Sequence, residues 1–308
     1  MDDSASNMEV VRYQAAHYVG EADLVGFAGP KKEILELISG DASAQVQVVW
    51  ITGTGGLGKT TLAKKVYESS EISAKFRSRA WITISQSFSV KELLKEMINQ
   101  LLGTESMKQL LEQREELIMS ENHLTDHLKK GLKERSYFLV LDDLWTTQAW
   151  DCIKPTFWGE NNKGSQVLVT TRNSNIVEAS SSSSRIYMLK TLEKEDTAKL
   201  LLRKTGRSLD DINKAEMAEI FDKILKKCGG LPLAIVTIGG LLARKDVKEW
   251  HGLYDQLPSE LETNLSLDAM RKVVMMSYNQ ARTSGGATCA TLPGRPFEGA
   301  AQIRPIDY

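Results

Sequence analysis

The chain has 308 residues, enough to bury a sizeable core in one large domain or two smaller ones. Its 39 Lys and Arg residues nearly balance its 40 Asp and Glu residues, and the net charge of −1 disfavours nucleic-acid binding. The 3 widely spaced cysteines and the absence of a visible signal peptide argue against a disulfide framework and favour a soluble protein of the cytoplasm, with the nucleus as the alternative compartment.

The first part of the chain alternates between apolar runs typical of buried strands and segments with helical periodicity. Residues 1–23 are expected to be a linker or N-terminal extension, and helices are predicted around 28–38, after residue 58 and over 90–102. Strands are predicted, in chain order, at 46–52, 79–84, 137–141, 166–171 and 185–189. Because strands alternate with helices, we expect an α/β fold: a doubly wound parallel sheet with helices on both faces over residues 24–190.

From residue 191 the pattern becomes mostly helical. Its clearest segments are Leu192–Leu202, Ala215–Cys228 and Pro232–Arg244, so a small helical domain is predicted over 191–264. The apolar run 231–243 is shorter than the roughly 20 residues of a membrane span and is expected to be a buried helix. Composition then shifts, and residues 281–308, rich in Gly, Pro, Ala, Thr and Arg, are expected to be an atypical, disordered tail.

The most informative stretch is a glycine-rich loop that follows the first predicted strand. It reads GTGGLGKTT and fits the G-x-x-x-x-G-K-[ST] phosphate-loop pattern. Its glycines allow the backbone N–H groups to approach phosphate oxygens, and a helix that begins at about Gly58 adds its positive dipole end. Lys59 is expected to reach the β- and γ-phosphates, and the Thr60 hydroxyl to bind Mg²⁺. The chain is therefore predicted to bind a nucleoside phosphate through Gly53, Thr54, Gly55, Gly56, Leu57, Gly58, Lys59, Thr60 and Thr61.

Charged residues follow two further predicted strands, where ligands bind in doubly wound sheets. Asp142 comes directly after the run 137–141 and is predicted to hold Mg²⁺. Asp143 is the candidate catalytic residue, a general base that polarises water; the alternative is that both carboxylates cap the following turn. Arg172 follows 166–171 and would sense the terminal phosphate, unless it is simply solvated.

Other conspicuous residues have simpler explanations. His123 and His127 have a spacing that can hold zinc, but without a third ligand an exposed helix face is the better interpretation. Trp145, Trp150 and Trp158 cluster after the acidic pair and are expected to cover the edge of the sheet.

Taken in order, a series of motifs is more specific than any one of them, and it resembles the NB-ARC module of plant nucleotide-binding leucine-rich-repeat disease-resistance proteins. The resemblance extends from about residue 23 to residue 280, and Trp81 and Trp145 are similar to the coiled-coil-type branch. The series comprises Val25-Gly26-Phe27, the loop 53–61, FRSRAWITIS at 76–85, YFLVLDDLW at 137–145, GSQVLVTTR at 164–172 and CGGLPLA at 228–234.

This resemblance implies a fold and a function. It implies a STAND-type phosphate-loop NTPase domain, then a helical domain with the Gly-Leu-Pro-Leu motif, then a winged-helix domain of which 265–280 would be the incomplete start. It also implies a switch of innate immunity that binds ADP or ATP with Mg²⁺. Val25, Gly26 and Phe27 would line the adenine pocket, and Pro232 would reach the base from the helical domain.

The sequence departs from the family where residues 281–308 replace the expected continuation, and the family's coiled-coil domain and leucine-rich repeats are expected to be missing. A truncated resistance protein is therefore expected. Two alternatives stay open: a phosphate-loop ATPase or kinase, and a non-signalling decoy that binds a full-length resistance protein or another immune protein. Any hydrolysis is expected to be slow and to reset a switch.

Overall fold

The computed structural model describes residues 25–40, 46–112, 120–133, 135–157, 164–179, 185–212, 215–243 and 245–255. The expectations for 1–23, for 265–280 and for the tail 281–308 lie outside these residues, as does Trp158.

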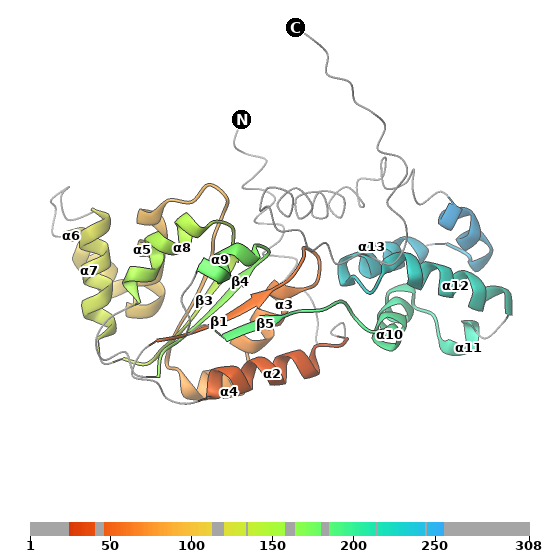
Figure 1. The fold of residues 1–308 in the computed structure, drawn as a ribbon, viewed down its shortest axis with the longest axis horizontal. Coiled ribbons are helices and arrows are strands. Elements are labelled where there is room, and N and C mark those ends of the chain that lie inside the picture. The colour runs from red at the N-terminus through yellow and green to blue at the C-terminus, as the bar shows by residue number, and fades with distance from the viewer. Residues whose placement is uncertain are drawn as a thin grey trace, which may run out of the picture.

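A five-stranded parallel sheet forms the centre of the first lobe (Figure 1). Its strand order is β2-β3-β4-β1-β5, and each adjacent pair runs parallel. Since parallel strands all end at the same edge, the loops that follow them are brought together there. The predicted sheet is confirmed, and its strands are β1 (Gln47–Thr52), β2 (Ser78–Thr83), β3 (Tyr137–Leu144), β4 (Gln166–Thr171) and β5 (Arg185–Met188).

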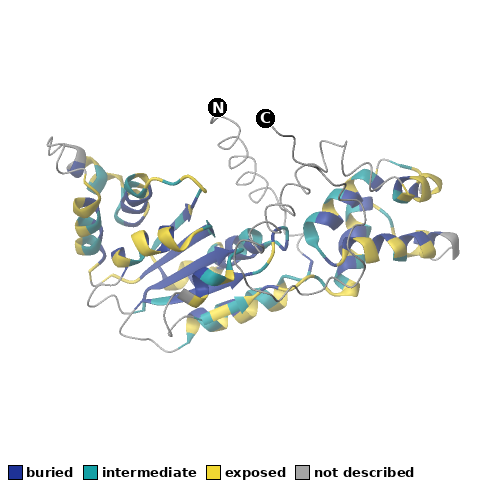
Figure 2. Ribbon diagram, turned by 45° about the horizontal axis from the view of Figure 1, so that its top comes forward, coloured by how far each residue is buried: buried dark blue, intermediate teal, exposed yellow. Residues whose placement is uncertain are grey.

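Helices cover both faces of the sheet, which leaves the three central strands β1, β3 and β4 buried (Figure 2). Successive residues of a strand point to opposite faces, so Val48 and Trp50 of β1 join one core while Val49 and Ile51 join the other. The Trp50 face is covered by α5 (Val90–Leu102), α7 (Glu121–Leu132), α8 (Thr147–Ile153) and α9 (Ser174–Ala179), with α6 (Thr104–Glu112) beside α5. The opposite face is covered by α2 (Ala28–Ser39), α3 (Lys59–Tyr67) and α4 (Ser70–Lys75).

Helix α5 shows how the sequence determines these layers. Its predicted range is confirmed, and the apolar residues expected on one face are buried: Leu93, Leu94, Met97, Ile98 and Leu101. The Ser89 hydroxyl caps its first turn by accepting from the backbone N–H of Glu92 at 3.4 Å. The helices α4, α8 and α9, of 6, 7 and 6 residues, were not predicted, because they are too short to show a helical period.

A second, helical lobe follows β5 and has its own core (Figure 1). It contains α10 (Lys194–Thr205), α11 (Leu209–Ile212), α12 (Ala215–Cys228) and α13 (Pro232–Leu242); short 3₁₀ turns occur at η3 (Lys154–Thr156), after α8 in the first lobe, and at η4 (Val247–Glu249). Val25, which precedes α2 in the chain, is buried in this core rather than in the sheet lobe. In the described part of the chain no helix is long and apolar enough to cross a membrane.

Candidate functional site

The carboxyl edge of the sheet brings together the loop after β1, the end of β3, and the residues that follow β4 and β5. Leu189, directly after β5, donates its backbone N–H to the carbonyl of Thr52 at 2.9 Å. The sheet therefore places the predicted phosphate loop next to the segment that leads into the helical lobe.

The glycines of the phosphate loop have the backbone freedom that the sequence predicted. Gly56 and Gly58 have φ of +82° and +92°, values that strain other residues. A Cβ on Gly58 would lie 2.9 Å from the Phe27 ring, and one on Gly56 would lie 3.0 Å from Cβ of Leu233. Helix α3 begins at Lys59 with no side-chain cap, so the start expected at about Gly58 is confirmed. Uncapped N–H groups at a helix start are suited to a phosphate.

Lys59 is folded onto its own loop. Its Nζ donates to the carbonyl oxygens of Gly53 at 2.7 Å and Thr54 at 2.8 Å, and the residue is 7% exposed. Burial, and then the charge of Arg172, lower the pKa of Lys59 to about 8, although nearby carboxylates act in the opposite direction. A buried cation next to a glycine cradle fits an anionic phosphate, whose charge would offset the cost of burial.

Asp142 is the buried carboxylate of the site. Its Oδ1 accepts hydrogen bonds from the hydroxyls of Thr60 at 3.0 Å and Thr170 at 2.6 Å. Burial raises the pKa of Asp142 to about 6; the Thr170 hydrogen bond opposes this shift and the charge of Asp143 adds to it. The carboxylate and the hydroxyl of Thr60 are oxygen ligands of the kind that Mg²⁺ prefers. Since the described residues hold no group of three or more His, Cys, Asp or Glu side chains that could bind a metal, phosphate oxygens and water would complete the coordination.

The acidic pair lies within β3, which corrects the prediction that the strand ends at residue 141. β3 continues to Leu144, and the β3–β4 register shifts between Leu141 and Leu144, as at a bulge. Asp143 has φ of +57°, and its N–H donates to the Thr170 hydroxyl at 2.8 Å. The irregularity turns Asp143 toward the neighbouring strand, where it contacts Arg172.

Arg172 pairs with Asp143 and stacks on Trp145. Its Nε lies 3.3 Å from Asp143 Oδ1, its Nη2 donates to Oδ2 at 3.5 Å, and its guanidinium carbon lies 4.9 Å from the centre of the Trp145 ring. The structure thus brings the predicted sensor and the predicted base into direct contact. That Asp143 polarises water stays a prediction.

One prediction about the tryptophans is wrong, and one polar residue of the site was missed. Trp150 was predicted to cover the edge of the sheet, but it is 2% exposed and packs edge-on in the core, with its ring centre 4.9 Å from that of Trp50. Thr170, whose hydroxyl donates to the Asp142 carboxylate and accepts from the backbone N–H of Asp143, was missed, because a Thr inside a β-rich run gives no signal beyond that of the strand. Its place directly before Thr171 and Arg172, at the end of β4, was the available clue.

The predicted adenine-binding segment lies at the junction between the lobes. Val25 is buried in the helical core, and a Cβ on Gly26 would meet the side chains of Leu192 and Asp196 at 2.6 and 3.1 Å. Phe27 packs against Gly58 at the start of α3. These residues therefore connect the start of α10 with the phosphate loop; contact with a base stays a prediction.

Pro232 is the first residue of α13, and its neighbour touches the phosphate loop. The N–H of Leu233 donates to the carbonyl of Gly56 at 3.2 Å, while the N–H of Leu192 donates to the carbonyl of Gly230 at 2.9 Å. The helical lobe therefore contacts the phosphate loop directly, whereas contact of Pro232 with a base stays a prediction. Leu233 was missed, because the sequence motif drew attention to the proline beside it.

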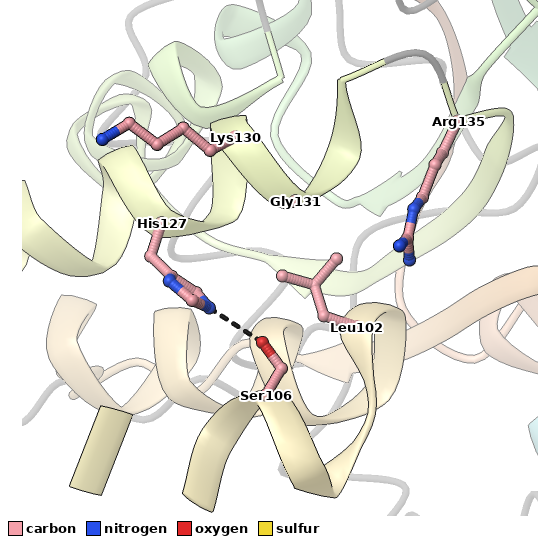
Figure 3. A pocket seen from close by; sticks show the side chains of 6 residues that line it. All are labelled: Leu102, Ser106, His127, Lys130, Gly131 and Arg135. Carbon is pink, nitrogen blue, oxygen red and sulfur yellow. Dashed lines mark hydrogen bonds between the residues drawn. The ribbon is translucent and has the colours of Figure 1, made fainter. Parts of the chain in front are cut away.

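A separate hollow of about 320 Å³ lies between α5, α6 and α7, at the opposite end of the sheet from the helical lobe (Figures 1 and 3). His127 Nε2 lies 2.8 Å from the Ser106 hydroxyl, and burial lowers the pKa of His127. The expected exposed helix face therefore holds for His123 but is wrong for His127, which is half-buried against α6. The residues that line the hollow are Leu102, Ser106, His127, Lys130, Gly131 and Arg135.

Comparison with known proteins finds a family and relatives that match most of this chain. The NB-ARC domain family matches residues 29–211. The disease resistance RPP13-like protein 3 of Arabidopsis thaliana is 31% identical over 266 residues, covering 85% of this chain and 31% of that protein. The disease resistance protein RPM1 of the same plant is 30% identical over 273 residues, covering 86% of this chain and 28% of that protein. Among solved structures, a signal transduction ATPase with numerous domains and a tetratricopeptide repeat sensor, from Pyrococcus horikoshii, has a TM-score of 0.45 and 19% identity, covering 74% of this chain and 32% of that one. The chain thus spans about a third or less of the length of these curated relatives.

Proposed function

The chain belongs to the NB-ARC domain family, and from that premise we propose that it is an ADP/ATP-binding switch of plant defence signalling. The observation that carries the proposal is the backbone hydrogen bond from Leu233 of α13 to Gly56 of the phosphate loop. A ligand held by this loop would contact a segment that is joined directly to the second lobe. Binding of this ligand, or a change in its charge, would therefore change the arrangement of the two lobes.

The nucleotide would be held by the residues at the carboxyl edge of the sheet. The loop 53–61 and the first turn of α3 would bind the phosphates, with Lys59 turning from its loop carbonyls toward them. Thr60 and Asp142 would hold Mg²⁺, which neutralises phosphate charge. Val25, Gly26, Phe27 and Pro232 are proposed to surround the adenine.

The pairing of Asp143 with Arg172 supports a switch rather than a rapid enzyme. Asp143 would have to leave this ion pair before its carboxylate could accept a proton from an attacking water. We therefore propose that the chain hydrolyses ATP slowly, and that this hydrolysis returns the switch to its ADP-bound state. A cytoplasmic location and assembly with a full-length disease-resistance protein are part of the same proposal.

Mass analysis of the nucleotide released from the denatured, purified protein would test the proposal first. ADP or ATP at near one molecule per chain is expected. Hydrogen exchange then tests the coupling: added ADP should slow exchange of the Leu233 amide, whose bond partner is Gly56. A chain that neither retains nor binds adenine nucleotide would overturn the proposal.

The variant Lys59→Arg tests whether the Lys59 ammonium itself contributes to nucleotide binding. A guanidinium is larger than the buried ammonium and cannot reproduce its contacts with the loop carbonyls, so affinity for ADP should fall. Lys65→Arg is the matched control: Lys65 lies on the same helix, is partly buried as well, and pairs with Glu68 at 3.7 Å rather than with the loop carbonyls. Equal affinities in the two variants would contradict the role of Lys59.

A further inference from the structure

Arg172 is held in place more firmly than an arginine at the end of a strand normally is. Its side chain is 10% exposed, although it follows β4 at the edge of the sheet. Asp143 engages one edge of the guanidinium through Nε and Nη2, and Trp145 covers its face. Both partners come from the end of β3 and the residue after it, so one short segment fixes the arginine.

Asp143, which holds the arginine, is connected to the phosphate loop by a chain of hydrogen bonds. The Asp143 N–H donates to the Thr170 hydroxyl at 2.8 Å, and this hydroxyl donates to Asp142 at 2.6 Å. Asp142 in turn accepts from Thr60, the residue after Lys59, at 3.0 Å. The position of Arg172 is therefore set relative to the loop that would hold the phosphates.

The two contacts of Arg172 differ in what a phosphate could do to them. The Asp143 carboxylate uses in-plane N–H groups, which are the groups that a phosphate oxygen would also bind, so the two anions would compete. The Trp145 ring contacts the face of the guanidinium and leaves the N–H groups available. The guanidinium can therefore stay stacked on Trp145 while its N–H groups release the Asp143 carboxylate and bind a phosphate oxygen.

We propose that Trp145 is the positioning residue for Arg172, and that its indole holds the guanidinium in the plane from which it distinguishes a nucleoside triphosphate from a diphosphate. The inference rests on the proposed function, because it assigns Trp145 to the same site. Trp145 would then contribute to recognition of the terminal phosphate, a role beyond packing at the edge of the sheet.

Titration of the whole chain with ADP and with a non-hydrolysable ATP analogue, both with Mg²⁺, tests this role. Trp145→Leu keeps an apolar side chain but removes the aromatic face. It should weaken binding of the ATP analogue by roughly threefold to tenfold, the effect of one partly buried cation–π contact, while leaving ADP affinity unchanged. Trp145→Phe retains a π face and should restore most of the lost affinity.

Trp81→Leu is the matched control, since Trp81 packs against Tyr67 at 5.7 Å on β2 and does not touch Arg172 in the structure. It should alter neither nucleotide's affinity. If Trp145→Leu weakens both nucleotides equally, or weakens neither, the positioning role is overturned.

A measurement without nucleotide separates this inference from the proposed function. The fluorescence of Trp145, taken as the difference between wild type and Trp145→Phe, should change when Arg172→Met removes the stacked cation. An unchanged Trp145 emission would overturn the contact itself. If the emission changes but the wild-type chain binds neither nucleotide, the proposed function fails, and the discrimination by Trp145 fails with it.

Discussion

Two adjacent glycines between α12 and α13 allow the junction of the lobes to be tested. Gly229 and Gly230 both have left-handed backbones, with φ of +57° and +70°. A Cβ at Gly229 would meet nothing within 4 Å, whereas one at Gly230 would lie 2.4 Å from the carbonyl oxygen of Leu192 and 3.1 Å from Thr191 Cβ. Alanine at Gly229 therefore reports backbone strain alone, and alanine at Gly230 reports strain plus the loss of a close approach to the segment that leads from β5 into α10.

The difference in free energy of unfolding can be worked out from these contacts. A left-handed non-glycine residue costs about 1–2 kcal/mol, and the stiffer unfolded chain offsets about 0.4–1 kcal/mol, so Gly229→Ala should cost about 1 kcal/mol. Gly230→Ala has the same strain and must also move the Leu192 carbonyl, which weakens the bond from Leu192 N–H to the carbonyl of Gly230. That bond is worth about 0.5–1.5 kcal/mol, and the backbone shift adds a comparable amount, giving about 3 kcal/mol in total.

Equilibrium unfolding in urea, followed in both variants, measures this difference. Since α13 begins two residues after Gly230 and contacts the phosphate loop through Leu233, Gly230→Ala should also weaken ADP binding, while Gly229→Ala should not. Equal losses of stability would show that the approach to Leu192 is unimportant. Reduced stability with unchanged ADP affinity would refute the link between the junction and the loop.

Four further outcomes are expected. Asp142→Asn should remove the dependence of ADP affinity on Mg²⁺, measured by titration with and without EDTA, because an amide is a poor ligand for that cation. Thr170→Val should destabilise the protein by about 1–3 kcal/mol in thermal unfolding, because the Asp143 N–H and the buried Asp142 lose a partner. Burial raises the pKa of Cys228 to about 12, so native Cys228 should resist alkylation at about pH 8 while exposed Cys152 reacts, as mass spectrometry would show. The raised pKa also means that stability falls as the pH rises from 9.0 toward 12, since the unfolded thiol ionises first.

Local patterns made much of the site predictable. The loop 53–61 was assigned because its glycines, lysine and threonine have fixed positions between an apolar strand and a helix, and the helix does begin where this pattern requires. Asp142 and Arg172 were assigned because each follows a buried run. That both lie at the same edge as the loop then follows from one rule, that parallel strands end at the same edge of a sheet.

Contacts that depend on strand order and on the lobes could not be predicted. The sequence does not show that β4 lies between β1 and β3, and this order is what places Thr170 beside Asp142. Trp150 was assigned to the edge of the sheet because the fold of α8 over Trp50 was unknown. The bond from Leu233 to Gly56 joins segments far apart in the chain, and no local period reports such a contact.

The phosphate loop is attached on two sides, and the two attachments differ in strength. Toward the sheet, Thr60 bonds to Asp142, which is 4% exposed and is also held by the buried Thr170 hydroxyl. Toward the helical lobe, the Leu233 bond to Gly56 lies among residues of intermediate exposure, where water can replace a lost partner. A ligand that shifts the loop should therefore break or remake the contact with α13 before it disturbs β3. That asymmetry makes movement of the lobe, rather than rearrangement of the sheet, the response that the fold favours.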